Sequence, residues 1–260
     1  MQKRVNQNQD DASLNDHSTM DKELEEIAEW KKLRPLLNNS YDFNVNSDNW
    51  TEAIKLFQTR LNRKFFKPIK SIIDKKILEG EGFTIVTVQC AIIESLASFR
   101  TGQIFSHKKV KGQPSYIYNE SGKMFVSFLH SSKIFKDNFY QIDQVQGLQK
   151  DIPFSASEFY TNVRCGLMHE SRTKGQWHIN ATKKDVKRER VFIERDGTKI
   201  KLLRTILHHR LTDCVKEYLQ DLKQISATGD NLRRLFGRKL DHLFDIPSAD
   251  QVGYNWWEDP

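Results

Sequence analysis

The chain has 260 residues and a mass of 30.5 kDa, which is enough to bury a substantial hydrophobic core. Basic residues outnumber acidic residues by 41 to 34, so the net charge of +7 permits nucleic acid as a partner without requiring it. The three cysteines are far apart, which excludes a disulfide framework and a thiolate zinc cage and predicts a reducing compartment. The first 21 residues lack an apolar stretch, so we expect no signal peptide and a cytoplasmic protein.

Residues 1–20 are polar and without period, which predicts a disordered tail, and residues 21–260 are expected to form a single domain. Apolar residues recur at helical spacing over 21–37, 50–78, 83–99, 123–139, 155–172, 203–225 and 231–244. Pro68 is expected to kink or interrupt the second of these helices, because proline lacks the backbone donor. The uncharged run at 83–93 is shorter than the roughly 20 residues of a bilayer span. It therefore predicts a buried core helix, and we expect no membrane as partner.

Two local signals mark element boundaries. Ser155 and Glu158 form an S-x-x-E capping box, which predicts a helix that begins there. Asp196-Gly197 lies between two apolar runs within 190–202 and predicts a two-residue hairpin turn, with a further strand at 177–181. The predicted fold class is therefore mainly α, a helical bundle that carries a small antiparallel β-hairpin near 190–202.

Several common chemistries are absent from the sequence. It contains no G-x-x-x-x-G-K-[ST] loop for phosphates, no complete dinucleotide-binding glycine motif and no G-x-S-x-G nucleophile elbow. His208 and His209 are adjacent and would point about 100° apart on a helix, which does not suit a shared metal ion. We expect neither a metal ion nor a cofactor.

The most informative segment is FYTNVRCGLMHESRT, residues 159–173. Arg164 is followed by four residues and then His169, on a late helix, after an aromatic pair and before a strand that begins with Trp177. This block resembles the Arg-x(4–6)-His signature of HEPN-domain proteins, over about 25 residues and more weakly toward the helix that holds Glu94. One position differs: the residue after the family's arginine is usually polar, whereas here it is Cys165.

The resemblance implies a small helical bundle that dimerises and brings two copies of the motif into one cleft. Many HEPN proteins are metal-independent endoribonucleases that commonly leave a cyclic phosphate end. In them the histidine takes part in proton transfer and the arginine holds the scissile phosphate, roles that fall here on His169 and Arg164. Catalytically silent HEPN domains also exist.

The residues themselves fit this chemistry. His169 suits acid–base work near neutral pH, and Arg164 is a permanently charged, forked donor for phosphate. Positions five apart lie about 140° apart on a continuous helix, so one chain makes a poor two-residue site and a two-fold dimer would complete it. The alternative is structural: Arg164 pairs with a carboxylate and His169 caps a polar pocket.

Three neighbouring residues extend this hypothesis. Glu94 is the single charge of an apolar helix and needs a partner, for which Arg164 or His169 is suited, whether for catalytic support or only to orient the bundle. Asn162 lies seven residues before His169, on the same face of a regular helix, where it could orient the ring or contact substrate. Cys165 could form a nucleophilic pair with His169, but its size and type favour a small core thiol.

Basic and aromatic residues elsewhere predict contacts with single-stranded RNA. The candidate RNA-binding residues are Lys183, Lys184, Lys187, Arg188, Tyr116 and Tyr118. Lys108, Lys109 and Lys111 stand in the same long loop as the two tyrosines. The alternative is that these lysines are solvated and protect the edges of a hairpin.

The leading functional hypothesis is a HEPN-type endoribonuclease, acting as a bacterial defence or toxin effector with RNA as substrate and a possible antitoxin or defence-system partner. The second hypothesis is a catalytically silent HEPN-like module that binds RNA, a nucleotide or a partner protein. A third is a helical interaction protein that uses Trp256 and Trp257 as anchors.

Overall fold

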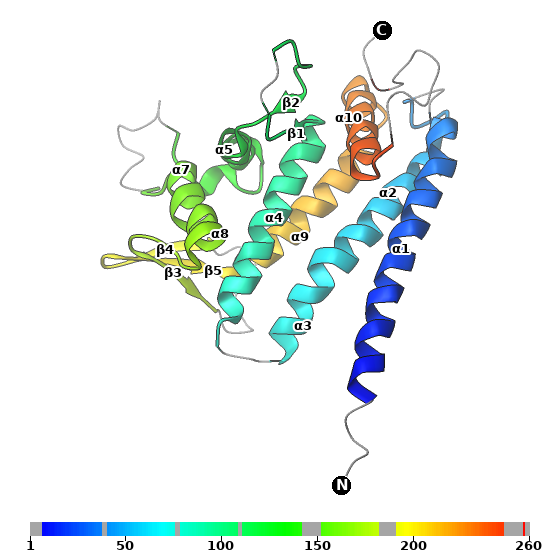
Figure 1. Cartoon of the computed structure of the whole chain (residues 1–260). Helices are drawn as coiled ribbons and strands as arrows, with labels where there is room; N and C mark the ends of the chain where they lie inside the picture. The colour runs from blue at the N-terminus through cyan, green and yellow to red at the C-terminus, as the bar shows by residue number, and fades with distance from the viewer. Residues whose placement is uncertain are drawn as a thin grey trace. The chain divides into compact units, whose positions relative to one another are not determined.

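The computed structural model describes residues 7–37, 41–75, 79–108, 111–141, 152–181, 191–246 and 257, with side chains from residue 20 onward. Its α-helices and strands are labelled in Figure 1. Its contacts divide the chain into two compact units, Met1–Thr59 with Lys223–Pro260, and Arg60–Leu222. The sequence pattern predicted one domain over 21–260, so this division is a difference that periodicity does not reveal. Each unit is described by itself.

The first unit contains α1 (Gln7–Leu37), most of α2 (Ser47–Leu61) and α10 (Ala227–Leu243). Helix α1 begins at Gln7, earlier than the predicted start at Asp21, because no glycine or proline interrupts the polar segment before the amphipathic part. Asp241 of α10 accepts hydrogen bonds from Trp30 Nε1 at 2.9 Å, Arg34 Nε at 2.8 Å and Trp257 Nε1 at 2.8 Å.

Trp257 is therefore an internal residue of the first unit, with only 5% of its surface exposed. Its indole donates to the buried Asp241 and its ring lies under the guanidinium of Arg238 at 5.1 Å. This burial argues against Trp257 as an anchor for a partner protein. Trp256 lies outside the described residues.

The second unit follows the chain from residue 60 to 222. Its helical elements are η1 (Asn62–Phe66), α3 (Lys67–Lys75), α4 (Glu81–Thr101), α5 (Ser121–Ser131), η2 (Lys136–Asn138), α7 (Ala156–Glu158), η4 (Phe159–Cys165), α8 (Gly166–Glu170) and α9 (Arg204–Asp221). The interruption predicted near Pro68 lies at η1, a π-helical segment that ends two residues before the proline. The mainly helical fold class is confirmed.

Helix α4 forms the core of this unit and packs against α5 and α9. Gln89 Nε2 donates to the carbonyl oxygen of Arg204 at 2.8 Å, and Tyr218 Oη donates to that of Phe99 at 3.2 Å. Among the described residues, α4 is the one helix that is long and apolar enough to cross a membrane. More than half of its most apolar stretch is buried inside the protein, as in the core helix of a soluble protein.

The strands form two small sheets. β3 (Trp177–Asn180) pairs parallel with β5 (Lys199–Leu203), which pairs antiparallel with β4 (Ile193–Asp196), giving the order β3-β5-β4. The turn between β4 and β5 is Gly197-Thr198, one residue later than the predicted Asp196-Gly197, and Gly197 adopts a positive φ of 60°. In the loop after α4, β1 (Ile104–Phe105) pairs parallel with β2 (Ile117–Tyr118).

Candidate functional site

The predicted helix at 155–172 is composite. The capping box is confirmed, because Ser155 Oγ accepts from the Glu158 amide at 3.0 Å while the Glu158 carboxylate accepts from the Ser155 amide at 3.2 Å. After one turn of α-helix the chain becomes the seven-residue π-helix η4, and then returns to α-helix as α8. The arginine of the Arg-x(4)-His motif lies in η4 and the histidine in α8. π-Helical segments occur often at functional sites.

Phe159 anchors η4 in an aromatic core. Its fully buried ring lies 5.8 to 6.3 Å from the rings of four other aromatic residues. These are Phe125, Phe139, Trp177 and Phe192. Aromatic pairs at such separations are favourable beyond their burial, so this cluster fixes the start of the segment that carries the motif.

Arg164 and Glu94 are brought together by the fold. Arg164 Nε donates to Glu94 Oε1 at 2.7 Å, and the two side chains are 16% and 26% exposed. Burial by itself would lower the pKa of Arg164, but the hydrogen bond and negative charge of Glu94 outweigh it, so this pKa is raised and the guanidinium stays charged. Of the two partners that the sequence allowed for Glu94, the structure selects Arg164.

Tyr160 is a second neighbour of Arg164. The guanidinium carbon lies 5.6 Å from the centre of the Tyr160 ring, a cation–π distance, and the phenol oxygen forms a 3.0 Å hydrogen bond with Ser121 Oγ. Gly122 makes room for this ring, because a Cβ at that position would lie 2.8 Å from Tyr160 Cε1. The sequence pattern identifies Tyr160 only as a member of an aromatic pair, because its hydrogen-bond partner Ser121 lies 39 residues away in the chain.

His169 lies at the surface near the end of α8, just before Ser171, which has a positive φ of 55°. Within the described residues, no hydrogen bond or ion pair joins His169 to Arg164. Asn162 is half-buried, and its backbone carbonyl accepts from the Lys174 amide at 2.8 Å. The predicted common face of Asn162 and His169 assumed a regular α-helix, whereas the segment between them includes part of η4, whose wider turn changes that register.

The cysteines near this site are thiols of different exposure. Cys90 is fully buried, and its pKa is raised by burial and, to a smaller extent, by the charge of Glu94. Cys165 is half-buried. The pKa of the Tyr160 phenol is raised mainly by burial, and Cys165 contributes to this rise.

The loop after α4 brings Tyr118 to the same region. Burial raises the pKa of Tyr118 to about 12, with further contributions from the charge of Glu94 and from Tyr160. The Tyr118 ring lies 5.4 Å from that of Phe105, which lies 4.8 Å from the exposed imidazole of His107. Phe105 and His107, which the sequence analysis did not single out, thus extend the aromatic surface beside the candidate site.

The other predicted RNA contacts are placed only in part. Tyr116 is half-buried, and its carbonyl accepts from the Ile104 amide at 2.8 Å in the small parallel sheet. Lys108 and Lys111 are exposed. The predicted basic residues Lys183, Lys184, Lys187 and Arg188, like Lys109, lie outside the described residues.

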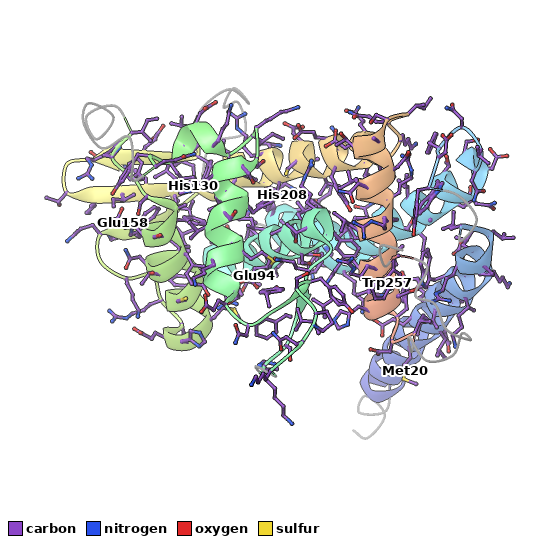
Figure 2. The ribbon with its side chains drawn as sticks, turned by 90° about the horizontal axis from the view of Figure 1, so that it is seen from above. Met20, Glu94, His130, Glu158, His208 and Trp257 are labelled. Atoms are coloured by element: carbon purple, nitrogen blue, oxygen red, sulfur yellow. The ribbon has the colours of Figure 1, made fainter. Side chains whose placement is uncertain are left out.

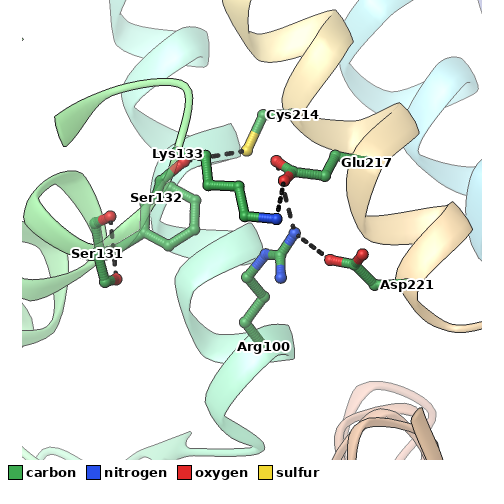
Figure 3. A network of polar contacts seen from close by, with 8 residues as sticks. Arg100, Ser131, Ser132, Lys133, Cys214, Glu217 and Asp221 are labelled. Carbon is green, nitrogen blue, oxygen red and sulfur yellow. Dashed lines mark hydrogen bonds and ion pairs between the residues drawn. The ribbon is translucent and has the colours of Figure 1, made fainter. Parts of the chain in front are cut away.

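A polar network joins α4, α9 and the segment after α5 (Figure 3). Its central residue, Arg100, lies on α4 six residues after Glu94. Arg100 Nη2 lies 2.9 Å from Asp221 Oδ2 and 4.0 Å from Glu217 Oε2, and Lys133 Nζ lies 3.6 Å from Glu217 Oε1. Two carboxylates surround this arginine, whereas Arg164 has one. Arg100 is therefore an arginine in an ion-pair network of similar exposure, and it offers a matched control for Arg164.

Two hollows flank α5. One of about 640 Å³ lies toward α4 and β2, with Arg100 and Tyr118 in its wall, and one of about 610 Å³ lies toward α7 and η4, with Tyr160 in its wall. Lys123, Ser127 and Ser131 line both, so they form the ridge that separates the two hollows. Figure 2 shows Glu94 and His130, which belong to α4 and to the end of α5.

Among the described residues, no three His, Cys, Asp or Glu side chains lie together as a metal ion would require. The chain matches no protein-family model, no curated protein and no solved structure. The candidate site thus consists of the charged Arg164 guanidinium, held by the Glu94 carboxylate and the Tyr160 ring, with a surface histidine on the same helical segment.

Proposed function

We propose that the protein is a metal-independent HEPN-type endoribonuclease that acts in the cytoplasm as a bacterial defence or toxin effector. In the reaction the ribose 2′-oxygen bonds to phosphorus and the bond to the 5′-oxygen breaks, which leaves a cyclic phosphate end. Arg164 holds the phosphate and His169 transfers a proton. Asn162 and Glu94 support these two residues, Glu94 through its hydrogen bond to Arg164.

The state of the Arg164 side chain carries this proposal. Only its Nε donates to a protein group among the described residues, so the two terminal amino groups remain available for a phosphate oxygen. The side chain is 16% exposed, so a ligand can reach it, while Glu94 and Tyr160 fix its orientation. A preorganised guanidinium of this kind suits the charge that develops on a phosphate during cleavage.

The distance from Arg164 to His169 along the helix supports a site shared by two chains. One chain presents the arginine within η4 and the histidine near the exposed end of α8. A homodimer that packs through 155–172 would place each arginine opposite the partner's histidine. The small HEPN-like bundle, the RNA substrate and a possible antitoxin or defence-system partner belong to the same proposal.

A silent HEPN-like module is the second candidate, and the Arg164–Glu94 ion pair is the observation that favours it. A guanidinium neutralised by a carboxylate can hold a bundle together without chemistry. Such a module would bind RNA, a nucleotide or a partner protein through the aromatic surface around Tyr118 and Phe105. It would not cleave.

Incubation of the purified protein with total RNA in the presence of a chelator separates the two candidates. The nuclease cuts RNA under these conditions, and Arg164→Ala and His169→Ala each lower the rate by about 10²–10⁴-fold. His178→Ala, at an exposed histidine of β3, is the matched control and keeps the rate. Cleavage by His169→Ala at the original rate would contradict the nuclease, and RNA binding without cleavage would favour the module.

A further inference from the structure

The hollow between α5 and the segment that carries Tyr160 is open to solvent and has the size of a ligand site. Its volume of about 610 Å³ lies within the range of small-molecule sites in proteins. Helix α5 lines it with positions that recur every four residues, so one face of the helix forms a continuous wall. The rest of the lining consists of Gln141, Ser157, Tyr160 and Thr161.

The chemistry of this hollow suits a flat, polar, uncharged ring. None of its lining residues is a carboxylate, and the lysine in its lining, Lys123, is 83% exposed and forms an ion pair with Glu120. Hydroxyl groups of Ser127, Ser157 and Thr161 stand beside an aromatic ring, an imidazole and an aliphatic side chain. The nearby Glu158 carboxylate is occupied by the capping box with Ser155. Aromatic and apolar surface for stacking, with hydroxyl donors and acceptors at its edge, is what an unpaired nucleobase requires.

His130 supplies an unsatisfied group in the wall of this hollow. Its Nε2 is buried and makes no hydrogen bond among the described residues. A buried ring nitrogen without a partner is unfavourable, and native structures rarely keep one without a reason. Nε2 is not exposed to the hollow in this conformation, so an edge nitrogen, oxygen or amino group of a bound base would satisfy it once the imidazole turns toward the hollow.

Tyr160 connects the hollow to the candidate active site. Its ring lines the hollow and also lies 5.6 Å from the Arg164 guanidinium carbon. From Gly122, beside Tyr160, to His130 is eight residues, or about 12 Å along α5. A nucleotide that places its base between Tyr160 and His130 thus has its phosphate on the Arg164 side.

We propose that this hollow binds the unpaired base next to the phosphate that Arg164 holds, and so selects the RNA sequence at the cleavage position. The inference rests on the proposed endoribonuclease function and names a base-reading site within it. Tyr160 provides stacking, and His130 with the hydroxyls of Ser127 and Ser157 reads the edge of the base.

Binding of short homopolymeric RNAs of A, U and C, measured by fluorescence anisotropy, tests this site without cleavage when done in a His169→Ala background. Ser157→Phe fills the hollow from an exposed position, and Thr198→Phe in the β4–β5 turn is the matched control. We expect a preference among the three RNAs. Ser157→Phe should weaken the preferred one about tenfold or more, and Thr198→Phe should not.

His130 is tested in the same assay with two variants. His130→Ala should lose most of the preference, while His130→Gln, which keeps a polar edge, should retain part of it. Thermal melting of each variant shows that the fold is intact. Unchanged preference in Ser157→Phe and His130→Ala would overturn the proposal. A Ser157→Phe protein that changes its mass by light scattering but binds RNA normally would also overturn it, by showing a surface between copies.

The assay separates this proposal from that of the nuclease. If the protein cleaves RNA and Ser157→Phe does not change the cleavage positions, the base-site proposal is wrong and the nuclease proposal stands. Base-selective binding that Ser157→Phe abolishes, in a protein that never cuts RNA, supports the base site and removes the nuclease.

Discussion

The Nε of Arg164 donates to Oε1 of Glu94 at 2.7 Å and so joins residues that lie 70 positions apart in the chain. Both side chains are partly exposed, at 16% and 26%. The pair therefore has water on one side and the packed core of α4 on the other. Its position allows a contribution to stability and, at the same time, access for an anion.

Removing one partner of this pair should destabilise the fold less than in a fully buried pair, where the loss is about 3–5 kcal/mol. We expect about 1–2 kcal/mol for Arg164→Ala, because solvent screens the remaining Glu94 charge. Glu94→Gln in the Arg164→Ala background should recover most of it, since the unpaired charge is then gone. Urea unfolding of the two variants measures this difference.

The Arg100–Asp221 pair provides the control for that experiment. Its side chains are 26% and 23% exposed, which is close to the values of the Arg164–Glu94 pair, and its distance is 2.9 Å. Arg100→Ala should destabilise by a similar amount without lowering the RNA cleavage rate per folded molecule. Equal loss of cleavage in both arginine variants would mean that Arg164 acts through stability alone.

Gly122 and Tyr160 should show strong coupling. A methyl group at position 122 would lie 2.8 Å from the Tyr160 ring, so Gly122→Ala must displace the ring and weaken its contacts with Ser121 and Arg164. We expect a loss of about 1–3 kcal/mol. In a Tyr160→Ala background the same change should be neutral or stabilising by up to about 1 kcal/mol, because alanine is the better helix former.

A double-mutant cycle by urea unfolding measures this coupling. Ser127→Ala, at an exposed position of the same helix, is the control and should change stability by no more than about 0.5 kcal/mol. Additive effects of Gly122→Ala and Tyr160→Ala would show that the glycine does not place the ring.

Local signals allowed much of the helical framework to be predicted. The Ser155–Glu158 capping box depends on residues three positions apart, and the apolar run of α4 by itself predicts that this helix is buried. The interruption before Pro68 follows from one residue whose backbone lacks a donor. Glu94 could be recognised because it is a lone charge in an apolar helix, although the choice of Arg164 over His169 as partner required the fold.

Other features depend on contacts that sequence spacing does not encode. The π-helix η4 contains Phe159, which packs on rings from four separate segments, so tertiary packing rather than local propensity accompanies its altered period. The parallel pairing of β3 with β5 joins strands separated by residues 181–198, and the hairpin signal gives no indication of it. Tyr160 and His130 emerge as site residues only when α5 lies beside η4.

The proposed homodimer makes a prediction about Met168. This residue of α8 is 53% exposed although apolar, and it precedes His169 on the helix predicted to form the interface. We expect a mass of twice the chain mass of 30.5 kDa by light scattering at micromolar concentration, and a monomer for Met168→Arg. Val191→Arg, at a site of similar exposure (49%), should remain dimeric. A monomer that still cleaves RNA would refute the shared site.

Lys239 of α10 predicts how the stability of the first unit depends on pH. Burial lowers its pKa from an ordinary value of 10.5 to about 8. Between these two values the unfolded chain binds more protons than the folded chain, so wild-type stability should rise with pH in this window.

Lys239→Met removes the titrating group, and the variant should be more stable than the wild type near pH 7. That advantage should shrink, by at most about 1.4 kcal/mol per pH unit, as the pH rises from 8 toward 10.5. Urea unfolding of both proteins across this range isolates the effect, because His242, whose pKa is lowered by burial and by the Lys239 charge, is neutral throughout it. Lys223→Met, at an exposed lysine, is the control for the change of side chain. A pH-independent difference for Lys239→Met would mean that the ammonium group keeps its hydration in the folded protein.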